Sequence, residues 1–217
     1  MEITWYGNSC FRITERNFAT VVTDPFDSAV AGYNPLKLKA EIVTVSSNNL
    51  SHNNISVVKG NPFVIEGPGE YERGGVFLTG IQTTPLMGDK DSRNTIYVLD
   101  YGSITILHLG QTNTVPSQTM VEELGNINIA LVPVGAGSAL NASKAAEVIS
   151  MLEPNIVIPM HYETPHSKLE LDPLSKFLKE MGLTELETME SFKISPTGSF
   201  SEEGTQVIAL DPKLSPL

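Results

Sequence analysis

The chain of 217 residues carries a formal net charge of −11, with 14 Lys and Arg residues against 25 Asp and Glu residues. A balance this acidic excludes a binder of the nucleic-acid backbone, which needs a basic stripe on its surface. Charged residues make up 18% and hydrophobic residues 41% of the chain, which is typical of a folded globular protein. The single cysteine, Cys10, excludes an internal disulfide and is typical of a reducing compartment.

The N-terminal stretch MEITWYGNSC contains neither the basic nor the apolar segment of a secretory signal. No stretch approaches the ~20 consecutive apolar residues of a membrane helix. We therefore expect a cytoplasmic protein with neither a membrane nor a nucleic acid as its partner.

Short apolar or alternating runs, most of them separated by Gly, Pro, Asn or Asp, predict strands over the first two thirds of the chain. In order they read EITWY, FRIT, ATVVTD, AEIVTVS, ISVVKG, PFVIEG, VFLTGIQT, NTIYVLDYG and SITILHLG. The GPGEYE segment between two of these runs predicts a tight turn, with a structural role for Glu70.

Beyond residue 112, predicted helices alternate with buried strands such as IALVPVGAG and NIVIPMHYE. The helices cover residues 117–125, 141–154 and 172–182, with Ser117, Asn141 and Asp172 as their N-caps. Pro173 then occupies the first position of the third helix. Because no repeat or low-complexity linker interrupts the pattern, we expect a single domain, residues 1–217, with sheets and helices in layers.

Three of the four histidines lie at or just past the end of a predicted strand. His52 ends EIVTVSSNNLSH, His108 ends SITILH and His161 ends NIVIPMH. A single histidine in such a place is most often structural, but three in equivalent places indicate convergence at one edge of a sheet. Asp24 in VVTDPF and Glu70 in EGPGEYE lie at similar strand-to-loop transitions.

Taken together, these segments resemble the metallo-β-lactamase superfamily, in particular its short cytosolic branch related to the L-ascorbate-metabolism lactonases. The resemblance is carried, in order, by ITWYGNSCFRI, TDPF, EIVTVSSNNLSH, IEGPGEYE, NTIYVLDYGSITILHLGQ, ALVPVGAG and IVIPMHYET. It implies an α+β fold, a four-layer αββα sandwich in which helices flank two mixed β-sheets. It also implies a hydrolase-like site that holds two divalent metal ions.

The resemblance also shows where this chain departs from the family's metal ligands. The family loop S-H-x-H-x-D-H reads SSNNLSH here, so Ser47, Asn49 and Ser51 replace two histidines and an aspartate. Gln111 replaces the carboxylate that bridges the two metals. His52 is kept, and so is the histidine of IPMHY.

Two other family histidines have changed as well. One would fall at Thr83, Thr84 or Pro85, and the other, in the family segment GHSCF, has become Asn8. Hydroxyl and amide groups are weak ligands for zinc. We therefore expect no tightly bound metal, and only a loosely bound divalent ion (Zn or Mn) at His52 and His161.

Three functional hypotheses remain open. In the first, the chain is a pseudoenzyme with a degenerate metal site, or a binding protein for a small polar ligand. The pocket would then be formed by Ser47, Asn49, Ser51, His52, Gln111 and His161. In the second, it is a metal-dependent hydrolase of an ester, lactone or phosphoester with a one-metal site. The catalytic candidates are then His52, His108 and His161. In the third, it is a homo-oligomeric scaffold.

Overall fold

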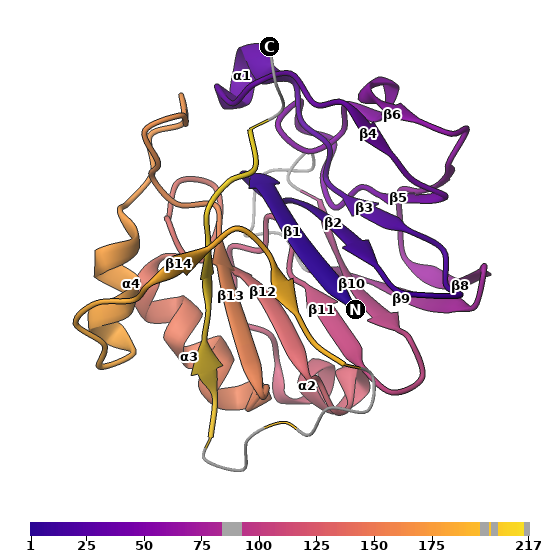
Figure 1. Cartoon of the computed structure of the whole chain (residues 1–217). Helices are drawn as coiled ribbons and strands as arrows, with labels where there is room; N and C mark the ends of the chain where they lie inside the picture. Colours follow the sequence, from indigo (N-terminus) through magenta and orange to yellow (C-terminus); the bar gives the residue numbers. More distant parts are fainter. Residues whose placement is uncertain (84–92, 196–199, 201–203, 215–217) are drawn as a thin grey trace.

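Two mixed β-sheets face each other at the centre of the computed structural model (Figure 1), which describes residues 1–83, 93–195, 200 and 204–214. The first sheet contains β1 (Glu2–Gly7), β2 (Cys10–Thr14), β3 (Val21–Thr23), β5 (Ile42–Thr44), β7 (Phe63–Ile65) and β15 (Phe192–Lys193). Their order across the sheet is β15-β1-β2-β3-β5-β7. Because β3, β5 and β7 run parallel, the loops that follow β3 and β5 leave the sheet at the same edge.

The second sheet has the order β16-β13-β12-β11-β10-β9-β8. Its strands are β8 (Gly69–Arg73), β9 (Val76–Thr83), β10 (Asn94–Asp100), β11 (Thr105–His108), β12 (Ile129–Pro133), β13 (Ile156–Met160) and β16 (Gln206–Val207). The strands from β8 to β11 are antiparallel, whereas β11, β12, β13 and β16 are parallel. The carboxyl ends of β11 and β13 therefore lie at one edge of the sheet.

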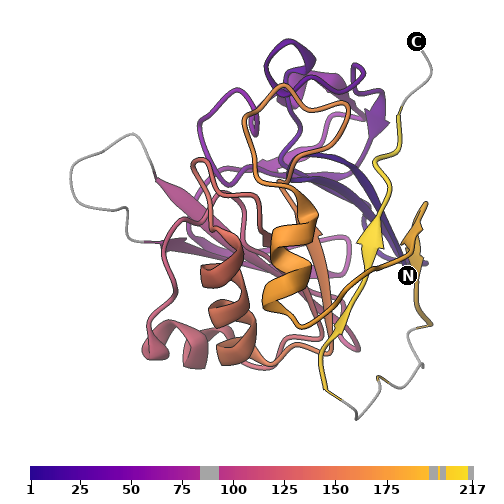
Figure 2. The same ribbon diagram turned by 90° about the vertical axis from the view of Figure 1, so that its left-hand side faces the viewer.

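Three helices cover the outer face of the second sheet (Figure 2): α2 (Gln118–Leu124), α3 (Ala142–Leu152) and α4 (Leu174–Glu180). Two predicted N-caps are confirmed, since Ser117 accepts a hydrogen bond from the backbone of Met120 and Asn141 accepts one from Lys144. The buried residues of α3 recur every three or four positions, which turns one apolar stripe toward the sheet.

The predicted cap of α4 is wrong by one residue. Pro173, with an extended backbone, is the N-cap, and Asp172 lies before the helix. The backbone N–H of Asp172 donates to Gly135 O at 2.8 Å, and its carbonyl accepts from Glu163 N at 2.9 Å. These tertiary bonds fix the backbone of Asp172 ahead of the helix, and its side chain pairs with Lys176 instead of capping the helix.

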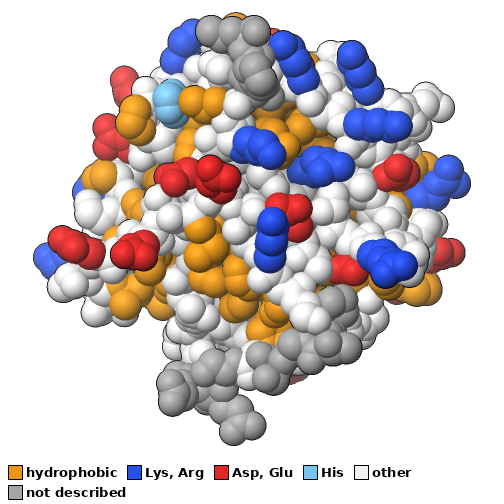
Figure 3. Space-filling view, in the orientation of Figure 1, with side chains coloured by type: hydrophobic (Ala, Val, Ile, Leu, Met, Phe, Trp, Pro, Cys, Tyr) orange, Lys and Arg blue, Asp and Glu red, His pale blue; other side chains and the backbone are white. Residues whose placement is uncertain are grey.

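A different layer covers the outer face of the first sheet. It contains the one-turn helix α1 (Ser28–Ala31), the 3₁₀ turn η1 (Ile55–Val57), and the short parallel strands β4 (Leu38–Lys39) and β6 (Val58–Lys59). This layer buries a second apolar cluster, which includes Phe26, Tyr33 and Val43. The αββα sandwich is therefore present, with a short helix and a two-stranded ribbon on this side. On the face that Figure 3 shows, basic side chains gather over this region, although the chain as a whole has a net charge of −11.

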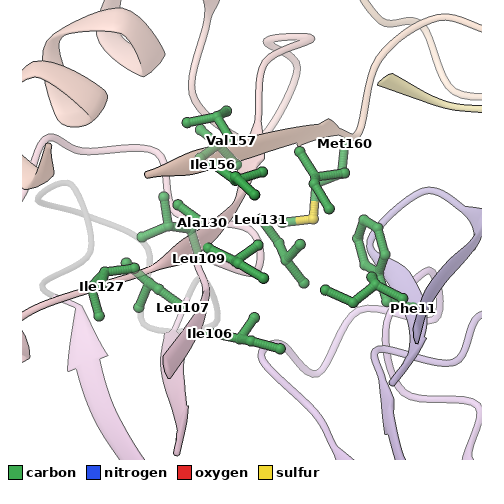
Figure 4. Packing of buried hydrophobic residues seen from close by; sticks show 14 of the residues in the cluster. Phe11, Ile106, Leu107, Leu109, Ile127, Ala130, Leu131, Ile156, Val157 and Met160 are labelled. Atoms are coloured by element: carbon green, nitrogen blue, oxygen red, sulfur yellow. The ribbon is translucent and has the colours of Figure 1, made fainter. Parts of the chain in front are cut away.

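The space between the sheets is filled by the main apolar cluster (Figure 4), to which Phe11 of β2, Ile106 of β11 and Met160 of β13 belong. Full burial of a large apolar side chain contributes about 1.5–3 kcal/mol. Two further short strands, β14 (Thr188–Met189) and β17 (Ala209–Leu210), pair with each other near the end of the chain. Among the described residues, no helix has the length and apolar character needed to span a bilayer.

The GPGEYE segment forms the turn that leads from the first sheet into β8. Gly69 has a φ of 143°, which a residue with a side chain rarely adopts. The Tyr71 hydroxyl lies 3.3 Å from Gly67 O and 3.2 Å from Pro68 O, so it closes the turn. Glu70 is exposed on β8. The segment therefore connects the two sheets, and it lies apart from the histidines described below.

Candidate functional site

Three histidines and one aspartate meet at the edge of the sandwich where the parallel strands end. Asp24 follows β3, His52 lies in the loop after β5, His108 ends β11 and His161 follows β13. His52 Nδ1 lies 2.9 Å from Asp24 Oδ2, and His108 Nε2 lies 4.0 Å from the same oxygen. The ring centroids of His52 and His161 are 6.0 Å apart. These four residues, named here the histidine cluster, bring together the three catalytic candidates of the sequence.

Asp24 is a fully buried carboxylate that is surrounded by hydrogen-bond donors. The backbone N–H of Ser46 donates to Oδ1 at 2.7 Å, while the Ser46 hydroxyl (2.5 Å) and His52 Nδ1 (2.9 Å) donate to Oδ2. Burial alone would raise the pKa of Asp24, but the facing His52 and His108 and the donated hydrogen bonds lower it below its ordinary value. Asp24 therefore stays ionised and fixes the orientation of His52.

Hydrogen bonding assigns the tautomer of each histidine. A carboxylate or a carbonyl oxygen only accepts, so the ring nitrogen that faces it carries the proton. His52 Nδ1 faces the buried carboxylate, His161 Nδ1 faces Asn8 Oδ1 at 2.6 Å, and His108 Nε2 faces Ser9 O at 3.0 Å. When a ring carries this one proton, its opposite nitrogen presents a lone pair.

Within the described part of the chain, these lone-pair nitrogens have no hydrogen-bond partner: His52 Nε2, His108 Nδ1 and His161 Nε2. The three residues are 0%, 0% and 2% exposed. Buried polar atoms in folded proteins are nearly always paired, so three unpaired nitrogens in one cluster require an explanation. Histidines that bind metals commonly show this pattern, in which one nitrogen is held by a carboxylate or carbonyl and the other is left for the ligand.

Burial keeps two of the rings neutral. It lowers the pKa of His161 to about 3, and the neighbouring His52 adds to this effect while Asp24 opposes it. Burial also lowers the pKa of His108, against the opposing effects of Asp24 and of the bond to Ser9. At neutral pH, His108 and His161 are therefore acceptors of hydrogen bonds or ligands of an ion, and not cations.

Asn8 links three segments of the cluster that are far apart in the sequence. Its Nδ2 donates to Ser51 O at 2.7 Å, which leaves Oδ1 to accept from His161 Nδ1. Its backbone carbonyl accepts from Trp5 Nε1 at 2.9 Å and from the backbone of His161 at 3.1 Å. Both Asn8 and His161 have a positive φ, of 49° and 52°. One asparagine thus positions β1, the loop after β5 and the end of β13.

The small polar residues of the SSNNLSH loop are bonded mainly to one another. Ser47 Oγ accepts from Asn49 N at 3.3 Å. Asn49 Oδ1 accepts from both the backbone and the hydroxyl of Ser51, at 3.1 Å each. Ser47 and Ser51 are buried, whereas Asn49 is exposed. The loop is therefore a self-bonded turn that delivers His52 to the buried carboxylate.

Gln111 is bonded away from the histidines. Its side-chain amide donates to Ser138 Oγ, and its backbone N–H donates to Asn94 Oδ1 at 2.7 Å. Asn94 Nδ2 also reaches Thr112 Oγ1 at 2.8 Å and Leu109 O at 3.2 Å, so this buried amide holds the turn after β11. Of the six expected pocket residues, Ser51 and His161 are joined through hydrogen bonds to Asn8, and the ring of His52 lies beside that of His161. Gln111 belongs to the separate network around Asn94.

The position of the remaining family histidine is described only in part. Thr83 ends β9, is buried, and donates through its hydroxyl to Asn94 O at 3.1 Å. Thr84 and Pro85 lie outside the described residues.

Sequence reasoning did not single out the supporting residues Ser9, Ser46 and Asn94. Ser46 binds Asp24 across 22 positions of sequence and Ser9 binds His108 across 99. No local motif marks such contacts. A polar residue at the start of the apolar run NTIYVLD was the one available signal for Asn94.

Three cavities lined by described residues lie elsewhere on the molecule. They have volumes of about 600, 640 and 500 Å³. The first and third lie around Glu2 and Lys193, and the second lies between the ends of α3 and α4. The histidines line none of these three, which agrees with their burial.

Known proteins are similar to this chain over most of its length. A UPF0173 metal-dependent hydrolase of Lysinibacillus sphaericus is 29% identical over 208 residues, covering 80% of this chain and 89% of the relative. A UPF0173 metal-dependent hydrolase of Thermoplasma acidophilum is 26% identical over 191 residues, covering 76% and 84%.

Among solved structures, a candidate Zn-dependent hydrolase of the metallo-beta-lactamase superfamily from Thermotoga maritima is 32% identical to this chain. It superposes with a TM-score of 0.77, covering 97% of this chain and 99% of that one. The family model of the beta-lactamase superfamily domain matches residues 2–161, which include Asp24 and all three histidines of the cluster. The chain therefore belongs to the beta-lactamase superfamily and has the metallo-β-lactamase fold.

Proposed function

We propose that this chain is a metallo-β-lactamase-fold protein that does not hold a pair of divalent metal ions and works as a binding protein rather than as a hydrolase. The observation that supports the proposal is the donor set of the histidine cluster. Since the relatives are named metal-dependent hydrolases, we compare the number and charge of the side chains at the cluster with those that a divalent ion requires.

The number of ligands is too small for zinc chemistry. A catalytic zinc ion is held by three protein ligands and keeps one position open for water or substrate. Among the described residues, no group of three or more His, Cys, Asp or Glu side chains is placed to hold a metal ion. The residues that stand at the family's other ligand positions offer neutral hydroxyl and amide groups, which bind such ions weakly.

Charge argues in the same direction. Asp24 is the carboxylate that contacts the histidines, and its two oxygens already accept hydrogen bonds from Ser46 and His52. Two divalent ions would bring four positive charges to a buried site that supplies one negative charge. An uncompensated buried charge costs several kcal/mol, so the pair of ions would not be retained.

A hydrolase with a single divalent ion is the second candidate. It is favoured by the way in which Asp24 and Asn8 hold Nδ1 of His52 and His161, an arrangement common around metal-binding histidines. Such an enzyme would cleave an ester, lactone or phosphoester. An oligomeric scaffold is a third reading. It predicts that self-association survives the loss of both His52 and His161.

The first test is the metal content of the protein, purified without a histidine tag after growth with zinc, manganese and iron. We expect each metal to be well below one equivalent by elemental mass spectrometry. Near-stoichiometric metal that disappears in His52→Ala or His161→Ala, but persists in the exposed control His166→Ala, would overturn the proposal. A screen of ester, lactone and phosphoester substrates would then follow.

A reconstructed site supplies the complementary gain-of-function measurement. The variant carries Ser47→His, Asn49→His, Ser51→Asp and Gln111→Asp together. If missing ligands are what prevents metal binding, this variant should retain zinc after dialysis and the parent should not. Circular dichroism establishes that the variant is folded. A folded variant that binds no more zinc than its parent would show that the ligand positions are not the limiting feature.

A further inference from the structure

His52 and His161 together present two buried imidazole nitrogens that no described residue binds. The atoms are the Nε2 atoms of the two rings, whose centroids lie 6.0 Å apart with the ring planes tilted by 32°. Because no three His, Cys, Asp or Glu side chains within the described ranges are placed to share an ion, the donor set at this point is these two nitrogens. Two donors are too few for zinc, which takes four ligands.

The surroundings limit the size of what can bind between the rings. His52 and His161 are 0% and 2% exposed, and the neighbouring Asp24 and Ser51 are 0% and 2% exposed. An organic ligand could not reach both nitrogens without displacing packed side chains. Burial of this degree favours a single ion over an organic ligand as the occupant.

The charge of the cluster limits the occupant further. An imidazole that binds an ion through its lone pair is neutral, so Asp24 supplies the compensating charge, with its Oδ2 held 2.9 Å from His52 Nδ1. One carboxylate balances one positive charge. A divalent ion would leave a net positive charge in a buried place, at a cost of several kcal/mol.

The donor atoms then select among monovalent ions. Hard cations prefer oxygen ligands, whereas imidazole nitrogen suits copper. Cu(I) and Ag(I) carry a single charge and form stable two-coordinate complexes, so they accept two nitrogen ligands without requiring further ones. We infer that His52 and His161 form a two-nitrogen site for a single monovalent d¹⁰ ion, Cu(I), with Ag(I) as its redox-inert analogue. The inference rests on the proposed function, because resident divalent ions would occupy the same nitrogens.

Two outer partners complete the site. Asp24 and Asn8 each accept the Nδ1 proton of one ring, at 2.9 Å and 2.6 Å, and so keep both Nε2 lone pairs available. Loss of such an outer partner typically weakens metal affinity by about 10–100-fold. Asn8→Ala should therefore weaken binding within that range without removing a ligand.

Cys10 is the competing candidate for a soft ion, since a thiolate is a strong ligand for Cu(I). Its thiol is fully buried in the second apolar cluster, and burial together with the negative charge of Asp24 raises its pKa well above the ordinary value. A thiol in such surroundings stays protonated and is a poor ligand. Cys10→Ser is therefore the control that separates the two sites.

The experiment is an anaerobic titration of the full chain with Cu(I) against a chromophoric chelator, repeated with Ag(I) while the histidine ring nitrogens are followed by NMR. We expect one equivalent of each ion to bind, shifting two imidazoles. Binding should be lost in His52→Gln and in His161→Gln, and kept in Cys10→Ser and in the exposed control His166→Gln. A tenfold excess of zinc should not displace the ion. Thermal unfolding of each variant shows whether it is folded.

Each contrary outcome has a distinct meaning. Binding that persists without the histidines, or that disappears in Cys10→Ser, would overturn the assignment. So would the absence of any binding to a chain that carries no divalent metal, in which case the proposed function survives and the inference does not. If the purified chain already holds stoichiometric divalent metal, the proposed function fails first, and the inference fails with it.

Discussion

Replacing Asn8 by alanine should destabilise the fold by more than the loss of one hydrogen bond, because the Asn8 side chain bonds two buried partners. The Asn8 side chain donates to Ser51 O at 2.7 Å and accepts from His161 Nδ1 at 2.6 Å. Alanine leaves both partners buried and unpaired, at about 1–3 kcal/mol each. Asn8 also has a φ of 49°, which costs alanine about 1 kcal/mol more. The free energy of unfolding should therefore fall by about 3–7 kcal/mol, which lowers Tm by about 6–28 °C in a chain of this size.

Asn17→Ala is the matched control. Asn17 is exposed and has a φ of 68°, so this variant carries the backbone cost with no buried partner to strand. Thermal unfolding by circular dichroism should show a loss of about 2–4 °C for Asn17→Ala. Equal shifts in the two variants would refute the reasoning, because the hydrogen bonds of Asn8 would then contribute nothing. A persisting, slowly exchanging Nδ1 proton of His161 in Asn8→Ala would refute it as well.

Two further changes test the electrostatics and the packing of the same region. Burial lowers the pKa of His161 from 6.5 to about 3, so the unfolded chain takes up this proton first. Stability is therefore complete above pH 6.5 and falls toward pH 3, with a loss of about 2–3 kcal/mol by pH 4.5. Urea unfolding should show a flatter pH dependence in His161→Gln and an unchanged one in the exposed His166→Gln; equal slopes would contradict the assignment. In the second change, a Cβ at Gly110 would overlap the side chain of Ser46 at a φ of 57°, whereas a Cβ at Gly102, at a φ of 81°, meets nothing within 4 Å. Gly110→Ala should thus cost about 2–4 kcal/mol and Gly102→Ala about 1 kcal/mol by chemical denaturation, and a reversed order would sink the packing argument.

The sequence predicted those helix boundaries that depend on contacts between residues a few positions apart. The caps of α2 and α3 follow from Ser117 and Asn141, since each side chain binds a backbone N–H three residues on. The cap of α4 was misplaced because Asp172 is held by Gly135 and Glu163, which are distant in sequence. The four residues of α1 are too few to produce a periodic signal, so the layer over the first sheet could not be read from the pattern.

The same distinction applies to the site. His52, His108 and His161 could be grouped from sequence because each follows a strand, and parallel strands deliver their ends to one edge. The partner of each ring could not be predicted. Asn8 binds His161 across 153 positions, and nothing around Asn8 in the sequence marks it as a histidine partner. The resemblance to a family located the changed ligands, but only the structure shows that Gln111 is bonded to Ser138.

The layer over the first sheet should control how quickly an ion enters or leaves the histidine cluster. His52 lies in the loop that leads from β5 into this layer, whereas Asp24, Asn8 and His161 each directly follow a strand of the two main sheets. A layer with a one-turn helix and two-residue strands has few backbone bonds of its own, so it should open in local fluctuations well below the free energy of global unfolding. Each opening would carry His52 away from Asp24 and leave His161 in place. Amide hydrogen exchange should therefore be faster in residues 26–40 and 53–60 than in β5, β12 and β13. The lifetime of this local opening, and not diffusion, would then set the rate at which an ion enters or leaves the cluster.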